Sequence, residues 1–189
     1  MPATTHILRR NASRLIQGLN EWHAQRTANA AWRRDQLLDR LLFSLARLYA
    51  KLELPGAVRI LEALHINRPE LWADAGFREC RGVWHGYRLR LDLSDFYQRW
   101  AYFLSRYHEV PLQVLLRAAL QPGDTFIDGG ANIGLTSLIG AWLVGPRGRV
   151  FAFEPNPSAF EPLTWHVQTN GLMQVTPLRV GLSDSEQEL

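Results

Sequence analysis

A glycine-rich turn between a short apolar segment and an apolar helix constrains this chain more than any other feature. Residues 125–128 are typical of a buried strand, residues 129–134 contain three glycines, and residues 135–144 are typical of a helix. Glycine adopts positive φ without steric cost, so such a turn lets the backbone bend tightly from strand into helix. Downstream, a strand (150–154), a helix (158–169) and a strand (175–182) are predicted.

Strands and helices that alternate in this way predict a parallel sheet with right-handed crossovers. We therefore expect the α/β class, as a partial doubly wound parallel sheet of the Rossmann-like type with about three core strands. Ligands of such sheets bind beyond the carboxyl ends of the strands, where the glycine-rich turn lies.

The first half of the chain lacks this alternation and is predicted to be helical. Residues 6–30 show weak helical spacing, whereas residues 32–53 repeat leucines at helical intervals and end before Pro55-Gly56. A short helix at 58–64 should follow. We expect the leucine stripe to pack within its own domain, because such packing supplies most helical stability. Docking of a partner or a membrane is the alternative.

The hydrophobic period changes to two near residue 80, which predicts a β-hairpin that turns at His85 and Gly86. Two more helices, at 94–106 and 110–120, should precede the first core strand. These features divide the chain into an N-terminal α-helical region, residues 1–80, and the first part of an α/β domain, residues 81–189.

Composition excludes several classes of protein. Hydrophobic residues make up 47% and charged residues 21%, which is the balance of a globular chain and not of a disordered one. No apolar stretch is long enough to span a bilayer. Cys80 is the only cysteine, so neither a disulfide within the chain nor a zinc site is expected, and a cytoplasmic location fits best.

The charge is unevenly distributed. Residues 1–105 hold 16 lysine and arginine residues against 10 acids, and residues 106–189 hold 5 against 8. A basic front can meet an anionic partner, but a solvated helical face is the simpler interpretation. We therefore expect no nucleic-acid partner.

Two carboxylates at the predicted strand ends narrow the choice of ligand. Asp128 ends the first core strand and Glu154 ends the second. An acid at the second position can accept hydrogen bonds from both ribose hydroxyls, which favours an adenosine-bearing ligand. In the alternative, Asp128 caps the loop through backbone N–H groups and Glu154 is an exposed strand-end charge.

Asp128 also separates two kinds of cofactor. A dinucleotide places its pyrophosphate against the helix N-terminus, where a carboxylate would repel it. S-adenosylmethionine has no phosphate and carries two cationic groups, so an acid suits it. The glycine spacing also departs from G-x-G-x-x-G, and no lysine follows for a triphosphate loop.

Four segments, in this order, resemble the FkbM-type family of S-adenosylmethionine-dependent methyltransferases: Asp128-Gly-Gly-Ala-Asn-Ile-Gly134, Val150-Phe-Ala-Phe-Glu-Pro-Asn-Pro157, Asn170-Gly-Leu172 and Gly181-Leu-Ser-Asp184. Tyr107-His-Glu109 and Gln121-Pro-Gly-Asp124 extend the resemblance upstream, so that it covers about residues 82–189. Gly129 departs from the family, which more often has an apolar residue there.

The resemblance implies transfer of the cofactor's methyl group, usually to an oxygen of a glycan, a polyketide or another small molecule. It also implies positions for the cofactor. The methionine part would be lined by Asp128, Gly130, Ala131, Asn132 and Gly134. Glu154 would hold the ribose, with Pro155, Asn156, Ser183 and Asp184 near the adenine. Glu109 is a further candidate for the ammonium end, or else a helix-start carboxylate favoured by the helix dipole.

The sheet of that family has further strands after the third, so we expect this chain to carry mainly the cofactor-binding half. Groups that deprotonate the acceptor usually follow the fourth strand, so the sequence indicates no catalytic base, and we interpret His85, His108 and His166 as surface or packing residues. We expect weak or absent activity from this chain alone. The alternative is an inactive remnant that binds a partner through its basic helical front. An NAD-dependent dehydrogenase is a third hypothesis, which Asp128 disfavours.

Overall fold

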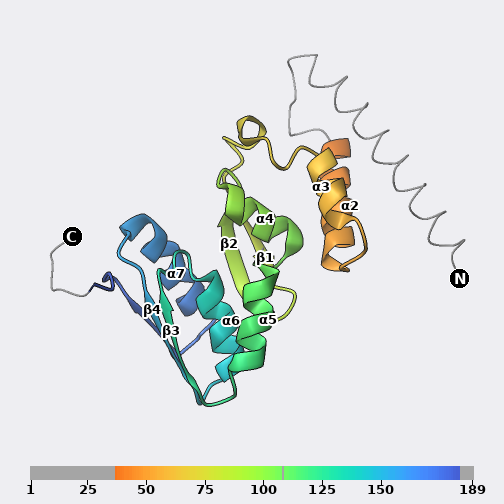
Figure 1. The fold of residues 1–189 in the computed structure, drawn as a ribbon. Helices are drawn as coiled ribbons and strands as arrows, with labels where there is room; N and C mark the ends of the chain where they lie inside the picture. Colours follow the sequence, from red (N-terminus) through yellow and green to blue (C-terminus); the bar gives the residue numbers. More distant parts are fainter. Residues whose placement is uncertain (1–36, 108, 184–189) are drawn as a thin grey trace, which may run out of the picture. The chain divides into compact units, whose positions relative to one another are not determined.

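A computed structural model describes residues 37–107 and 109–183, which form two compact units (Figure 1). The first unit contains the described residues up to Gly76 together with Asp92–Leu104. The second contains Phe77–Leu91 together with the described residues from Ser105 onward. The helix predicted at 6–30, His108 and Asp184 lie outside the described residues.

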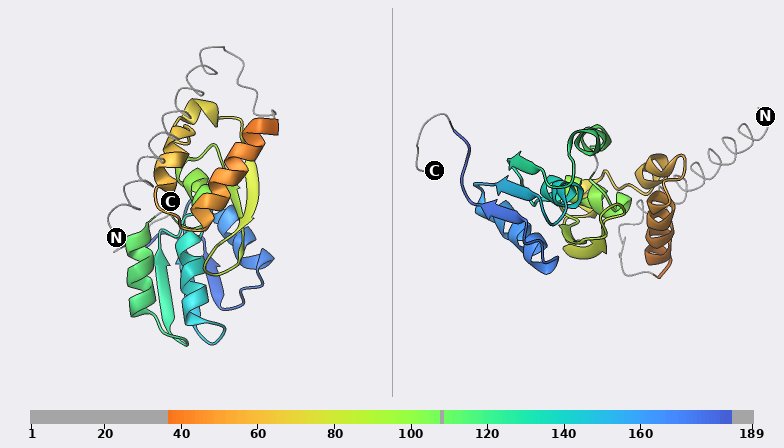
Figure 2. Two further views of the ribbon diagram at one scale, coloured as in Figure 1. Left: turned by 90° about the vertical axis from the view of Figure 1, so that its right-hand side faces the viewer. Right: turned by 90° about the horizontal axis from the view of Figure 1, so that it is seen from below.

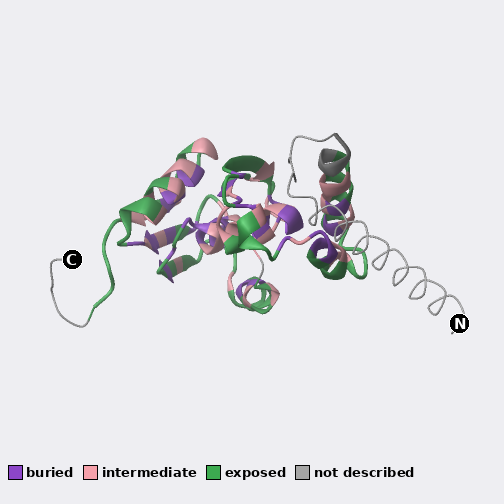
Figure 3. Cartoon of the chain, turned by 90° about the horizontal axis from the view of Figure 1, so that it is seen from above, coloured by how far each residue is buried: buried purple, intermediate pink, exposed green. Residues whose placement is uncertain are grey.

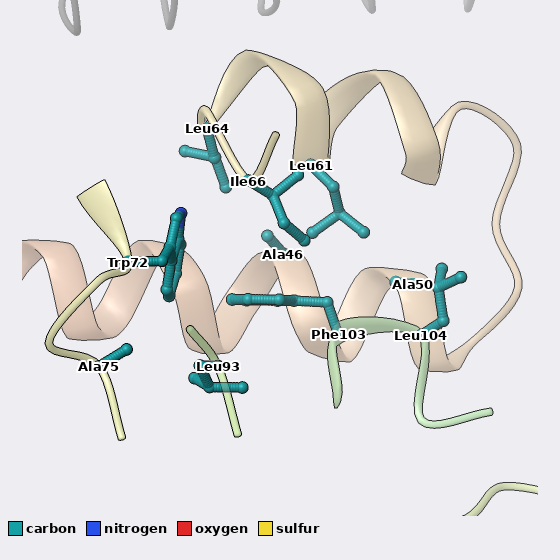
Figure 4. Close-up of a cluster of buried hydrophobic side chains, with 10 residues drawn as sticks. All are labelled: Ala46, Ala50, Leu61, Leu64, Ile66, Trp72, Ala75, Leu93, Phe103 and Leu104. Atoms are coloured by element: carbon teal, nitrogen blue, oxygen red, sulfur yellow. The ribbon is translucent and has the colours of Figure 1, made fainter. Parts of the chain in front are cut away.

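The first unit is helical, as predicted. It contains α2 (Leu37–Lys51), α3 (Ala57–Ala63), the 3-10 turn η1 (Pro69–Leu71) and α4 (Phe96–Leu104). Its core brings Trp72 and Phe103 together with their ring centroids 5.6 Å apart and nearly perpendicular (Figure 4). The rest of this core is aliphatic: Ala46, Ala50, Leu61, Leu64, Ile66, Ala75, Leu93 and Leu104.

The expectation that the leucine stripe at 32–53 packs inside its own domain is wrong for four of its members. Leu41, Leu45, Leu48 and Leu52 are between 50% and 62% exposed. The buried side of α2 carries Ala46 and Ala50 instead, with Phe43 against the same core. The helix therefore has two apolar faces, one with leucines and one with alanines. The spacing of the leucines alone does not tell which face is buried.

The second unit contains the predicted parallel sheet, which confirms the α/β class. Its strands are β3 (Thr125–Gly129), β4 (Arg149–Phe153) and β5 (Val175–Leu178), in the order β3-β4-β5. All neighbours are parallel, and Asp128 is level with Ala152 of β4. Helices α6 (Leu135–Val144) and α7 (Pro157–Thr169) connect these strands, and α5 (Val110–Ala119) packs against α6 (Figure 2).

Two strands differ from their predicted bounds. β5 ends at Leu178 and not at residue 182; Pro177 has no N–H to donate, and residues 179–183 are exposed (Figure 3). The predicted hairpin exists, but its strands are β1 (Phe77–Arg81) and β2 (Arg88–Asp92). The segment from Gly82 to Tyr87, which the alternation suggested as strand, is the turn.

The turn of the hairpin is built around the ring of His85. A Cβ at Gly82 would lie 2.3 Å from Cε1 of His85, so only glycine lets the ring fold over this position. The Nδ1 atom of the ring accepts a hydrogen bond from the Tyr87 N–H at 3.1 Å. Burial lowers the pKa of His85 to about 4, and the neighbouring His166 adds to the effect.

This low pKa predicts that the folded chain loses stability at pH values above the range in which carboxylates titrate. The unfolded chain binds a proton at His85 near pH 6.5, while the folded chain keeps the ring neutral down to about pH 4. Stability from this residue is therefore complete above pH 6.5 and is lost as the pH falls, with about 2 kcal/mol lost by pH 5. Urea unfolding at pH 7.5 and 5.0 measures the loss. His85→Asn can still accept from Tyr87 but cannot titrate, so it should reduce the difference; equal stability of the unsubstituted chain at both pH values would contradict the prediction.

Candidate cofactor site

The glycine-rich loop after β3 is fixed to the end of β4 by backbone hydrogen bonds. The N–H groups of Gly130 and Ala131 both donate to the Phe153 carbonyl at 2.9 Å. Gly130 and Gly134 have φ of 77° and 88°, and Asn132 has φ of 51°. Asparagine tolerates this conformation better than most residues, and its Oδ1 accepts from the Ile133 N–H at 2.8 Å. The loop thus depends on the residue types that the sequence analysis selected.

The Glu154 carboxylate binds both the glycine-rich loop and the segment that follows β4. Its Oε2 accepts from the Asn132 N–H at 2.8 Å and its Oε1 accepts from the Asn156 N–H at 2.9 Å. The residue is 7% exposed. It is therefore not the exposed strand-end charge of the alternative interpretation. Because each carboxylate oxygen can accept more than one hydrogen bond, the group can still bind ligand hydroxyls.

Asp128 is buried beneath the loop, with 8% of its surface exposed. Its Oδ2 accepts from the Ser137 hydroxyl at 2.5 Å. Burial raises the pKa of the Asp128 carboxyl, the hydrogen bonds from Ser137 oppose this rise, and the nearby charge of Glu154 adds to it. The sequence analysis missed Ser137. It lies in the first turn of α6, where a polar residue within an apolar helix was the available signal.

These two acids have no cationic partner in the described part of the chain. No lysine or arginine there forms an ion pair with either, while Arg88 and Glu79 do pair, at 2.7 Å. Buried charges are costly unless they are paired or hydrogen-bonded, and two like charges raise that cost. The site is therefore suited to a ligand that brings positive charge.

The structure brings together eight of the predicted ligands at the ends of β3 and β4. Asp128, Ala131, Gly134 and Glu154 are buried, while Gly130, Asn132, Pro155 and Asn156 are exposed around them. Asn156 also begins α7, because its Oδ1 accepts from the Ser158 N–H at 3.0 Å.

The other three predicted ligands are not among these eight. Ser183 is exposed beyond β5, and Asp184 lies outside the described residues. Glu109 is the exposed residue before α5, as the helix-dipole alternative requires.

The described segments hold no group of three or more histidine, cysteine or acidic side chains that could bind a metal ion. Within the same segments, no helix is both long enough and apolar enough to cross a membrane.

No protein-family model matches the chain. It is similar to the hexuronic acid methyltransferase AglP of Haloferax volcanii, with 33% identity over 104 residues. The match covers 55% of this chain and 41% of AglP, so the chain spans about two fifths of that relative. The chain is thus a partial relative of a methyltransferase.

Solved methyltransferase structures also match in part. A putative rRNA methylase from Clostridium thermocellum is 28% identical, with a TM-score of 0.35, over 36% of this chain and 38% of that one. An S-adenosylmethionine-dependent O-methyltransferase from Thermotoga maritima is 24% identical, with a TM-score of 0.38, over 44% of this chain and 32% of that one.

Proposed function

We propose that this chain is the cofactor-binding part of an S-adenosylmethionine-dependent methyltransferase of the FkbM type. The observation that carries the proposal is the pair of buried acids, Asp128 and Glu154, which have no basic partner in the described segments and lie at the ends of adjacent strands. The similarity to AglP supports the reaction class. Two of the segments that resemble the FkbM type, residues 128–134 and 150–157, meet at this sheet edge.

The residues present fit this cofactor, which supplies a methyl group activated by a sulfonium charge. Glu154 would accept the ribose hydroxyls while it keeps Asn132 in place. Asp128 would offset the positive charge of the methionine part. A Cβ built on Gly130 meets no atom within 4 Å, so the loop leaves open space on that side. Pro155 and Asn156 would border the adenine.

An NAD-type ligand fits less well. Its pyrophosphate would lie against the N-terminus of α6, whose first turn contains Ser137, the hydrogen-bond partner of the buried Asp128 carboxylate. Repulsion between that carboxylate and a doubly charged pyrophosphate disfavours a dinucleotide.

The acceptor that we propose is a hydroxyl of a glycan or a related small molecule, because AglP is by name a hexuronic acid methyltransferase. The division at residues 80 and 81, a cytoplasmic location, and roles for Glu109, Ser183 and Asp184 beside the cofactor remain predictions. The exposed leucines of α2 favour a second candidate, a binding module built on the helical front. A chain that binds no adenosine compound would favour that candidate.

Calorimetric titration tests the cofactor. S-adenosylmethionine and S-adenosylhomocysteine should both bind, and NAD should bind at least about 30-fold more weakly, because the site presents a carboxylate beside the position that its pyrophosphate would take. Tighter binding of NAD, or no binding of either adenosyl compound, would refute the proposal.

Asp128→Asn should have two effects of opposite sign. The amide keeps an acceptor for the Ser137 hydroxyl but removes a charge whose burial is unfavourable, so the ligand-free chain should become more stable at pH 7. Binding of S-adenosylmethionine should weaken by about tenfold, because an interaction between opposite charges is lost. Ser137→Ala is the matched control: it removes the hydrogen bond and keeps the charge. A variant that is destabilised and binds normally would mean that Asp128 is only structural.

A further inference from the structure

Helix α7 and the residue that caps its C-terminus, Asn170, present two polar side chains to the backbone of β2. The Arg88 N–H donates to Oδ1 of Asn170 at 2.7 Å, and Nδ2 of Asn170 donates to the Arg88 carbonyl at 2.9 Å. One turn earlier on α7, Nε2 of His166 accepts from the Arg90 N–H at 2.9 Å. Alternate strand residues and helix residues four apart both repeat at about 6–7 Å, so the two spacings match.

The other nitrogen of the His166 ring contacts the glycine-rich loop. Nδ1 lies 2.8 Å from the Ile133 carbonyl. Because Nε2 accepts from an N–H, the ring is neutral and its proton is on Nδ1, which donates to that carbonyl. The residue is fully buried, so no solvent competes for either bond.

Ile133 lies between two loop residues of unusual backbone conformation. Asn132 on one side and Gly134 on the other both have positive φ, and the Asn132 N–H binds Glu154. A positive φ at a non-glycine residue such as Asn132 persists only where surrounding contacts over-determine it. The His166 ring supplies such a contact from outside the loop, and the Arg90 N–H holds the ring in orientation.

We propose that His166 is a positioning residue, which holds the cofactor loop in its binding shape by fixing the Ile133 carbonyl. Asn170 belongs to the Asn170-Gly-Leu172 segment, and the structure gives it a supporting part: it fixes β2 beside His166. The link from loop shape to cofactor affinity rests on the function proposed above; the link from His166 to the loop does not.

Two substitutions separate the two bonds of the ring. His166→Gln can place an oxygen near Nε2, which keeps the bond from Arg90 and loses the bond to Ile133. His166→Asn can place an amide near Nδ1, which keeps the bond to Ile133 and loses the bond from Arg90. Amide hydrogen exchange by NMR reads the Arg90, Asn132 and Ile133 N–H groups one by one, and calorimetry with S-adenosylhomocysteine reads affinity.

In His166→Gln the Asn132 and Ile133 amides should exchange about tenfold faster while Arg90 stays protected, and affinity should fall about tenfold. In His166→Asn the Arg90 amide should lose protection, while loop exchange and affinity change less than about threefold. Asn170→Ser is the control for a loosened hairpin: it should expose the Arg88 amide and leave the loop amides unchanged.

Equal effects of the two His166 variants on the loop amides, or unchanged loop amides in His166→Gln, would overturn the proposal. Faster loop exchange with normal affinity would overturn the part that concerns the cofactor. If the unsubstituted chain binds no adenosyl compound, the proposed function fails, and the exchange pattern still decides whether His166 positions the loop.

Discussion

Glu154→Gln should weaken binding of S-adenosylhomocysteine by about 30-fold, which corresponds to about 2 kcal/mol. Both oxygens of Glu154 accept backbone N–H groups, from Asn132 and Asn156. A glutamine offers only one oxygen, so its NH₂ group must face one of these donors. The substitution thus removes a ribose acceptor and disturbs the loop at the same time. Calorimetric titration of both chains measures the change.

The matched control is Glu161→Gln, which makes the same change at an exposed position of α7. It should leave affinity unchanged within about twofold, because exposed charges contribute little. Normal binding by the Glu154 variant would remove the central residue of the proposed site. Equal losses in both variants would indicate a nonspecific effect of charge.

The sheet and its loop could be predicted because local signals coincide there. Strand β3, the glycines and α6 each have their own pattern, and the structure places α6 at the predicted residues, Leu135–Val144. Parallel strands end at a common edge, so the positions of Asp128 and Glu154 in sequence were enough to bring them together.

The contacts that shape the loop could not be predicted in the same way. His166 reaches Ile133 across 33 residues and Arg90 across 76, and no local pattern encodes such pairs. From sequence alone, a histidine within a helix is therefore interpreted as a packing or surface residue. Side-chain hydrogen bonds depend on the tertiary arrangement, which periodicity does not specify.

The exposed face of α2 shows that local sequence patterns also fail to specify which apolar residues are buried. Leucines recur there at helical spacing, yet the buried side is the one with Ala46 and Ala50. A hydrophobic period identifies a helix with an apolar face. It does not identify the buried face when a second side carries small apolar residues.

Gly134→Ala should destabilise the chain by about 3 kcal/mol, because backbone strain and crowding act together at this position. Gly134 precedes α6 with φ of 88°, a conformation that costs an alanine about 1–2 kcal/mol. The new Cβ would also lie 2.5 Å from Cδ1 of Leu163, which is fully buried in α7. Leu163 must therefore shift inside a packed core. Urea unfolding measures the loss.

Substitutions at two other glycines separate the cost of backbone strain from the cost of crowding by the added methyl group. Gly130→Ala adds a methyl group at φ of 77° with no atom within 4 Å, so it should cost only the backbone strain, about 1–2 kcal/mol. In Gly140→Ala, within α6, the new Cβ would lie 2.4 Å from Cδ1 of Phe126. The better helix propensity of alanine offsets about 1 kcal/mol of the cost of this crowding. Gly134→Ala should exceed both, because there strain and crowding act together and nothing offsets them. A loss no larger than that of Gly130→Ala would show that the contact between Leu163 and the start of α6 is loose, and the loop would then have less support from α7 than its hydrogen bonds indicate.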